Sequence, residues 1–148
     1  MRVALAQKLP ILIPKLGKRR FNEHFLPLVL ALLRDESMDV KSVFLDHFAP
    51  IFEVISPTTM IEALEPVLND MAKAILWRNK KIALEFIVKI ATVSGKEGMK
   101  ESLIKIVADL MKDNFESVRD VVCQTIIRFK EILGEEWIVQ FMMPELEK

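Results

Sequence analysis

Residues 35–55 read DESMDVKSVFLDHFAPIFEVI, residues 74–94 read AILWRNKKIALEFIVKIATVS, and residues 113–133 read DNFESVRDVVCQTIIRFKEIL. Each stretch starts 39 residues after the one before it, and the pairs Val40-Lys41 and Val118-Arg119 fall at the same place within it. Apolar residues recur in each stretch at the spacing of three and four that marks a helix with one buried face. A fixed period of this length predicts a protein built from repeated helical units.

The same period holds at many other positions of the chain. One position is always basic: Arg2, Lys41, Lys80 and Arg119. Another is always small, where a helix would end: Gly17, Ser56, Gly95 and Gly134. A third is always apolar: Leu9, Phe48, Ile87 and Ile126. Agreement at several independent positions makes the 39-residue repeat a stronger signal than any single motif.

Each unit contains two helices, which we name A and B in chain order. The predicted helices are B at about 1–16, A at 22–34, B at 39–55, A at 59–73, B at 78–93, A at 98–112, B at 117–133 and A at 136–147. Neither helix buries its apolar stripe alone, so neighbouring pairs must stack. The expected fold is all-α: an α-solenoid, a right-handed superhelical stack of antiparallel helix pairs.

Residues 1–148 therefore form one predicted solenoid segment. It comprises a lone B helix at 1–17, repeats at 22–55, 59–93 and 98–133, and a lone A helix at 136–147. We expect a piece of a longer solenoid or a very short one, with apolar surface at both ends through which copies self-associate. Prolines share one position of helix A and should bend it: Pro27, Pro66 and Pro144.

The composition argues against several classes of function. Twenty-one basic and 21 acidic residues balance, so neither nucleic acid nor a membrane surface is an expected partner. The sequence has no phosphate-binding loop and no nucleophile elbow, and its two histidines, His24 and His47, fall in different helices. We therefore expect neither an enzyme nor a bound metal or cofactor. The single cysteine, Cys123, shares its repeat position with Leu45 and Leu84 and is predicted to lie in or near the core.

The segment between helices A and B carries a family signature. Asp followed five residues later by Val and a basic residue occurs at Asp35 and at Asp113, and this layout resembles HEAT repeats. The middle unit departs from the signature, with Ala74 in place of Asp and Asn79 in place of Val. A ladder of Asp–Arg pairs between layers should therefore be broken or weakened at the middle unit.

Three further stretches narrow the resemblance to the scaffolding A subunit of protein phosphatase 2A. They are Glu23-His24-Phe25-Leu26-Pro27-Leu28, the Trp77-Arg78 turn followed by Ala83-Leu84-Glu85-Phe86, and Gly134-Glu135-Glu136-Trp137. The resemblance implies a cytoplasmic or nuclear scaffold whose A–B turns hold the phosphatase catalytic subunit and regulatory B-type subunits. An importin-β-like receptor, or another HEAT adaptor for transport or assembly, is the alternative.

The predicted partner-binding residues lie at the A–B turns. They are Trp77, Arg78, Asn79, Lys80, Phe115, Glu116, Glu36 and Met38. A turn Trp beside an Arg is typical of an interface hot spot, although the Trp could also fold back over the helix ends. Lys80 and Lys81 begin a helix, which is unfavourable for its dipole, so we expect acidic residues of a neighbouring layer or of a partner beside them. Trp137 is expected to pack on the preceding B helix.

Overall fold

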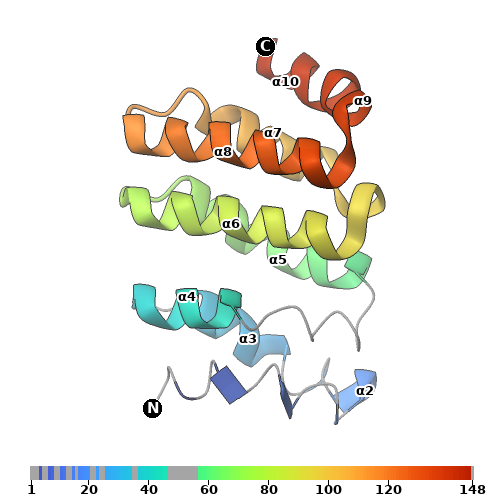
Figure 1. The fold of residues 1–148 in the computed structure, drawn as a ribbon. Coiled ribbons are helices and arrows are strands. Elements are labelled where there is room, and N and C mark those ends of the chain that lie inside the picture. Colours follow the sequence, from blue (N-terminus) through green and yellow to red (C-terminus); the bar gives the residue numbers. More distant parts are fainter. Residues whose placement is uncertain are drawn as a thin grey trace. The chain divides into compact units, whose positions relative to one another are not determined.

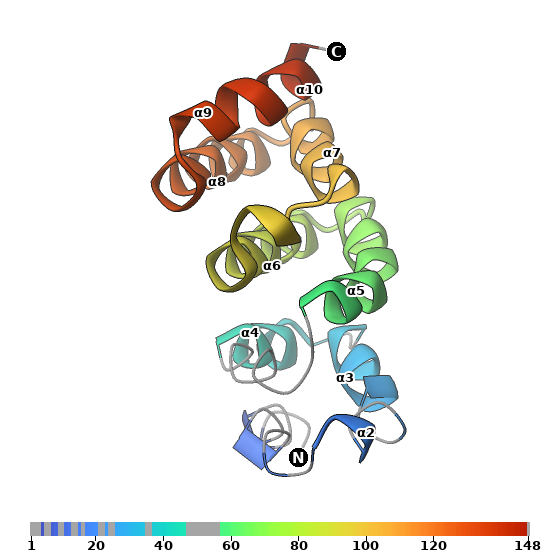
Figure 2. The same ribbon diagram turned by 90° about the vertical axis from the view of Figure 1, so that its right-hand side faces the viewer.

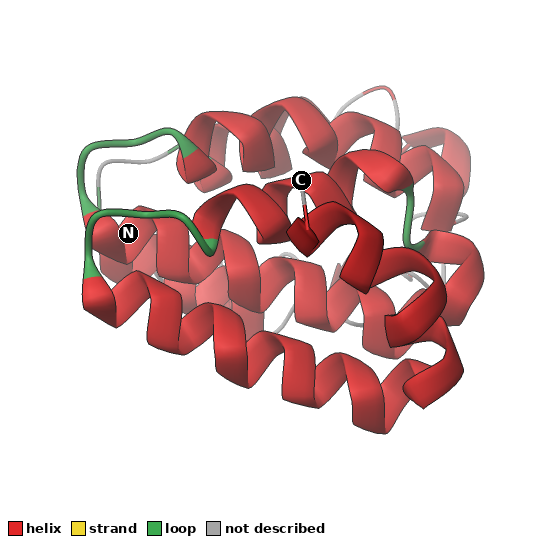
Figure 3. Ribbon diagram, turned by 90° about the horizontal axis from the view of Figure 1, so that it is seen from above, coloured by secondary structure: helices red, strands yellow, loops and turns green. Residues whose placement is uncertain are grey.

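The structure is a computed structural model, and it describes residues 4, 7–8, 11–12, 15, 17–20, 23, 26–34, 37–46 and 57–147. Every regular element in these residues is helical, and short loops join the helices (Figure 3). The prediction of an all-α fold is confirmed for this part of the chain. Two compact units divide the chain, Met1–Val67 and Leu68–Lys148, and each is described in turn.

The first unit is built around two short helices, α3 (Leu26–Leu33) and α4 (Met38–Asp46), which pack against each other. Their buried side chains follow helical spacing: Val29, Leu32, Leu33, Val40, Phe44 and Leu45. Of the helix predicted at 22–34 the structure describes Leu26–Leu33 as α-helix, and it describes the one predicted at 39–55 only as far as Asp46.

Two further helical segments belong wholly or partly to this unit. A single helical turn, α2 (Lys18–Arg20), precedes α3. Arg19 of that turn forms an exposed ion pair with Glu23 at 3.2 Å, and Arg20 is exposed as well. Helix α5 (Pro57–Ala72) starts in the first unit and ends in the second, and Pro66 lies inside it as predicted.

The second unit contains two helices of equal length, α6 (Trp77–Ser94) and α8 (Glu116–Leu133), which start 39 residues apart. They pack side by side, and α7 (Glu101–Leu110) connects them from a second layer (Figures 1 and 2). The predicted bounds of these B helices are 78–93 and 117–133. Both observed helices begin one residue earlier, α6 also ends one residue later, and α8 ends where predicted.

Both long helices end at a glycine with positive φ. Gly95 has φ +64° and ψ −152°, and Gly134 has φ +93° and ψ +158°. Side chains other than that of glycine are strongly disfavoured in this region of backbone space. The N–H of each glycine still donates to a carbonyl of the last helical turn, that of Ala91 or Lys130. Gly95 and Gly134 therefore end α6 and α8 because their backbone conformation is accessible mainly to glycine.

The segments after each glycine are irregular where a plain helix was predicted. Residues Gly95–Gly98 form a 3₁₀ helix, η3, so the helix predicted at 98–112 begins only at Glu101. After Gly134 the chain forms α9 (Glu135–Trp137), a π-helical turn η4 (Ile138–Met142) and α10 (Met143–Glu147). The π-helical turn ends two residues before Pro144, which has no backbone N–H for the regular ladder.

Trp137 closes the core between α8 and the last helical segments. Its side chain is buried, and its ring meets that of Phe129 edge-on, with centroids 5.7 Å apart and planes at 77°. The prediction that Trp137 packs on the preceding B helix is confirmed. Edge-to-face pairs of this kind add about 0.5–1.5 kcal/mol to the stabilisation from area burial.

Cys123 corrects one prediction. The sequence predicted a core or near-core position, because Leu45 and Leu84 at the same repeat position are apolar; both are buried, but Cys123 is exposed. Leu84 belongs to α6, which has α8 packed against it. No described helix covers the corresponding face of α8, so the same repeat position faces solvent there.

Candidate functional site

The A–B turns of the second unit expose apolar side chains. The first turn, residues 73–76, joins α5 to α6, and the second, residues 111–115, joins α7 to α8. Ile75 is 90% exposed, Leu76 is exposed as well, and Phe115 is 48% exposed. Exposed apolar groups gathered at loops are typical of surfaces that bind other proteins.

A side-chain bridge ties the two turns together. Lys80, in the first turn of α6, donates a hydrogen bond from Nζ to Oδ2 of Asp113 in the second turn. The other carboxylate oxygen of Asp113, Oδ1, accepts a hydrogen bond from the backbone N–H of Phe115 at 2.9 Å. Arg119 donates to the carbonyl oxygen of Asp113 at 2.6 Å. Asp113 therefore fixes its own turn, the start of α8 and the neighbouring helix α6.

The environment of Asp113 determines its ionisation. Desolvation of the carboxyl group raises its pKa, but the hydrogen bond from Lys80, the one from the Phe115 N–H and the positive charges of Lys80 and Arg119 act in the opposite direction. The net effect holds the pKa of Asp113 below its usual range, so the carboxylate stays ionised wherever the protein is folded near neutral pH.

The Lys80–Asp113 bridge bears on the ladder expected between layers. The sequence predicted a broken or weakened ladder at the middle unit because Ala74 replaces the Asp and Asn79 replaces the Val. Ala74 offers no carboxylate, so the prediction holds for that half of the unit. The basic residue that follows, Lys80, nevertheless reaches the Asp of the next turn. The pairing also confirms the expectation that acidic residues of a neighbouring layer compensate for a lysine near the start of α6.

Trp77 and Arg78 lie at the start of α6, next to the exposed apolar turn. The Arg78 guanidinium carbon is 5.7 Å from the centroid of the Trp77 ring, a cation–π distance. Trp77 is half-buried and Arg78 is exposed. Trp77 therefore combines the two alternatives considered for it: part of the ring packs on the protein, and part is available to a partner.

Phe115 and Glu116 occupy the matching place in the second turn. Phe115 is the residue immediately before α8, and the Lys80 ammonium lies 5.8 Å from its ring centroid. Glu116 is exposed in the first turn of α8, where a negative charge favours the helix dipole. Asn79 is half-buried, and its backbone N–H donates to the Leu76 carbonyl at 3.1 Å. The structure thus brings six of the predicted site residues to two linked turns.

The other two predicted site residues belong to the first unit. Glu36 lies outside the residues that the structure describes. Met38 is the first residue of α4, and its side chain lies outside the described part.

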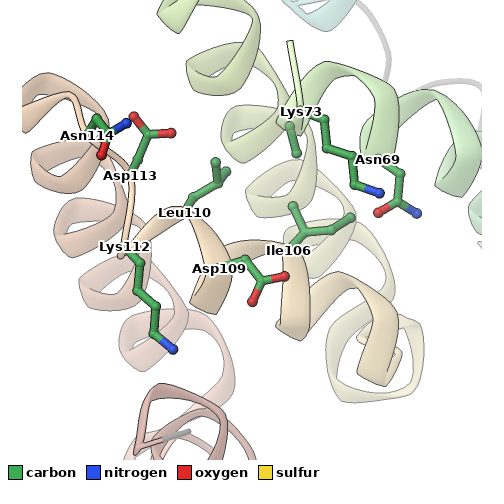
Figure 4. Close-up of a pocket in the computed structure, with 9 residues that line it drawn as sticks. Asn69, Lys73, Ile106, Asp109, Leu110, Lys112, Asp113 and Asn114 are labelled. Carbon is green, nitrogen blue, oxygen red and sulfur yellow. The ribbon is translucent and has the colours of Figure 1, made fainter. Parts of the chain in front are cut away.

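An open groove of about 260 Å³ lies beside the two turns, and the sequence reasoning did not anticipate it. Figure 4 shows the end of α5 on one side of the groove and the end of α7 with its following turn on the other. Its lining residues are Asn69, Ala72, Lys73, Ile106, Asp109, Leu110, Lys112, Asp113 and Asn114. These residues come from segments about 40 residues apart, and only the repeat period could have suggested that they meet.

The groove has a hydrophobic floor and a polar rim. Leu110 and Ile106 are buried, whereas Lys73, Lys112 and Asp109 are exposed. The charge of Asp113 is already balanced by Lys80. The other charged side chains at the rim are Lys73, Lys112 and Asp109, so the rim has a net positive charge. The groove thus suits an extended segment that carries both apolar and acidic side chains.

Other kinds of site receive no support from the described residues. They contain no group of three or more His, Cys, Asp or Glu residues that could hold a metal ion. Among the same residues, no helix is long and apolar enough to span a membrane. His24 and His47 lie outside the described part.

Comparison with known proteins gave no match: no family model fits the chain, and no curated protein matches it significantly.

Proposed function

We propose that this chain is a protein-binding scaffold of the HEAT-repeat type that presents its A–B turns to a partner. The observation that carries the proposal is the Lys80–Asp113 bridge, which joins two turns that each expose aromatic or apolar side chains. A partner that contacts both turns gains affinity from each. Such a gain is large when the contact points are held in place before binding, because less entropy is lost on association.

Trp77, Arg78 and Phe115 are the proposed energetic centre of this surface. Trp and Arg are enriched among residues that contribute more than about 2 kcal/mol to protein interfaces. Arg78 is exposed and sits beside the Trp77 ring, and Ile75 and Leu76 extend the apolar surface from the preceding turn. This arrangement supports binding, since hydrophobic anchors are flanked by a charge that orients the partner.

The proposed partner is the catalytic subunit of protein phosphatase 2A, held beside a regulatory B-type subunit. This identity rests on the sequence resemblance of the Trp77-Arg78 turn and of the stretches around Glu23 and Gly134. The proposed mechanism is positional: the scaffold carries out no chemistry, and it determines which substrates reach the enzyme it holds.

The proposal is tested by measuring the affinity of the immobilised chain for purified phosphatase catalytic subunit. We expect the double variant Trp77→Ala, Arg78→Ala to bind about 100-fold more weakly than the wild type, which corresponds to the loss of two hot-spot side chains. Arg128→Ala combined with Val139→Ala is the matched control, since it removes an exposed Arg and an exposed apolar side chain away from the turns.

Three results would contradict the proposal. They are no binding by the wild-type chain, equal binding by the turn variant and the wild type, or binding instead to a small GTPase in its GTP form, as an importin-like receptor would show. Because Trp77 is half-buried, the exposed single variant Arg78→Glu is measured alongside. It reverses a charge on the same surface and removes the cation–π contact with Trp77, but it leaves the Trp77 side chain in place.

A further inference from the structure

A basic and apolar stripe is exposed near the start of the chain. Five exposed residues with helical backbone recur there at i, i+4, i+7, i+8 and i+11, the spacing of a single helix face: Ala4, Lys8, Ile11, Leu12 and Lys15. We name this set the basic face. Ile11 is 57% exposed and Leu12 is 48% exposed, which is unusual for neighbouring large apolar residues on one stripe.

The repeat shows that such positions are normally covered. Two periods further on, Lys8 corresponds to Phe86 and Leu12 corresponds to Ile90, and both of these α6 residues are fully buried. Three periods on, Leu12 corresponds to Phe129 of α8, which is also fully buried. Lys8 and Leu12 therefore occupy positions that face a packed neighbour elsewhere in the chain, whereas Ile11 and Lys15 correspond to positions that are exposed or half-buried on α6 and α8.

An acidic and apolar stripe is exposed on α8. Its members recur at i, i+4, i+7, i+11 and i+15: Glu116, Asp120, Cys123, Ile127 and Glu131. We name this set the acidic face. Ile127 is 58% exposed, and Lys130 at the margin adds one positive charge.

The centre of the acidic face falls on positions that are covered in the preceding layer. One period earlier, Cys123 corresponds to Leu84, which is fully buried on α6, and Ile127 corresponds to Val88, which is half-buried. Asp120 and Glu131 correspond to the exposed Lys81 and Thr92, so they form a charged rim around this centre. Helix α8 itself packs on α6. The acidic face is therefore where α8 would receive another B helix in the way that α6 receives α8.

We propose that the basic face of one copy of this chain packs on the acidic face of the next copy, head to tail. Ile11 and Leu12 would meet Cys123 and Ile127, which places apolar surface against apolar surface. The charges are complementary: Lys8 and Lys15 carry two positive charges, whereas the acidic face with Lys130 has a net charge of about −2 at neutral pH. Glu116 is the one residue that the acidic face shares with the turn surface, and the other residues of both faces lie outside the turns. The proposal is therefore tested separately from the proposed function.

The geometry has a consequence for the assembly. The two faces lie in different parts of the chain and differ from each other, so the contact is heterologous. Two copies joined by one such contact still carry one unused basic face and one unused acidic face. Further copies add through these faces as the protein concentration rises, so the assembly grows into an open chain or closes into a ring.

Charge reversal with light scattering after size-exclusion chromatography tests the proposal on the whole chain under reducing conditions. We expect the wild-type average mass to rise above 17.1 kDa with concentration and to fall when salt is added. The variants Lys8→Glu, Lys15→Glu and Asp120→Lys, Glu131→Lys should each associate at least tenfold more weakly. Mixed in equal amounts they should associate again, because each then offers a face that complements the other.

The control for Lys8→Glu, Lys15→Glu is Lys96→Glu, Lys105→Glu, which lowers the net charge by the same amount at exposed positions outside both faces and should behave as the wild type. Circular dichroism confirms that each variant is helical. A wild-type chain that stays monomeric at all concentrations overturns the proposal. So does a mixture of the two reversed variants that fails to associate while both are folded.

Cross-linking distinguishes the direction of stacking. Cys123 is the single cysteine of the chain, so a bis-maleimide links wild-type copies only when two acidic faces meet. Head-to-tail stacking predicts no linked wild-type dimer. It predicts a ladder of dimers, trimers and longer products for Ala4→Cys, which adds a thiol to the basic face. Efficient linking of the wild type, or no ladder with Ala4→Cys, contradicts the head-to-tail contact.

Discussion

Removal of the Asp113 carboxylate should weaken both turns and the contact between α6 and α8. The variant Asp113→Ala leaves the Lys80 ammonium without its partner and the Phe115 N–H without its acceptor. The two side chains of the pair are 14% and 9% exposed, so little water replaces the lost interaction. The perturbation therefore differs from the loss of an ordinary surface ion pair, which changes stability by about 0–1 kcal/mol.

The expected magnitude lies between two limits. Removing one partner of a fully buried ion pair costs about 3–5 kcal/mol, and removing a side-chain cap from a helix start costs about 1 kcal/mol. Because Lys80 sits at a turn and retains its contact with the Phe115 ring, we expect Asp113→Ala to lower the free energy of unfolding by about 2–3 kcal/mol. Asp113→Asn keeps an oxygen for the Phe115 N–H, so it should cost about 1 kcal/mol less.

The assay is a double-mutant cycle by urea unfolding, followed by circular dichroism and tryptophan fluorescence. Its members are wild type, Asp113→Ala, Lys80→Met and the double variant, since Met keeps most of the apolar stem of Lys80. A direct interaction predicts a coupling energy of about 1–2 kcal/mol. If the losses of unfolding free energy in the two single variants sum to the loss in the double variant within about 0.5 kcal/mol, the bridge is refuted as a source of stability.

Three further results follow from the structure. The pKa of Asp113 is lower in the folded than in the unfolded protein. Its contribution to the free energy of unfolding should therefore be complete above the unfolded pKa of about 3.9 and be lost as pH falls through the folded pKa. The urea midpoints of wild type and Asp113→Asn should accordingly converge in acid. Trp137→Ala should cost about 3–5 kcal/mol in thermal or urea unfolding, whereas the volume-reducing Trp137→Phe should cost clearly less. Gly95→Ala and Gly134→Ala should each cost about 1–3 kcal/mol by urea unfolding, and no comparable loss is expected for the exposed control Thr92→Ala.

The sequence was sufficient to locate the helices whose boundaries have a local cause. Periodic apolar residues and the glycines at 95 and 134 place the ends of α6 and α8 to within about a residue. The irregular segments at 95–98 and 138–142 were not foreseen, because 3₁₀ and π-helical turns depend on small shifts in hydrogen bonding that have no distinct apolar pattern.

The candidate site was predictable in its residues but not in its connections. The repeat placed Trp77, Arg78 and Phe115 at turns, where the structure also finds them. The Lys80–Asp113 bridge spans 33 residues, and its formation depends on how far α6 and α8 are offset along their axes. The offset is determined by tertiary packing, which the sequence pattern does not give. The sequence therefore predicted only that acidic residues lie near Lys80. The exposure of Cys123 was missed for a related reason, since repeat position alone does not say whether a neighbour is present.

The pairing of α6 with α8, and of α7 with α10, has a consequence for how this unit forms and opens. Each packing partner lies about one repeat away along the chain, so few contacts require the closure of a long loop. Low contact order of this kind favours fast folding and allows structure to spread from one pair of helices to the next. Opening then proceeds in the reverse order. We expect the α10 segment, which has no buried residues, to exchange its amide hydrogens before the α6–α8 pair does.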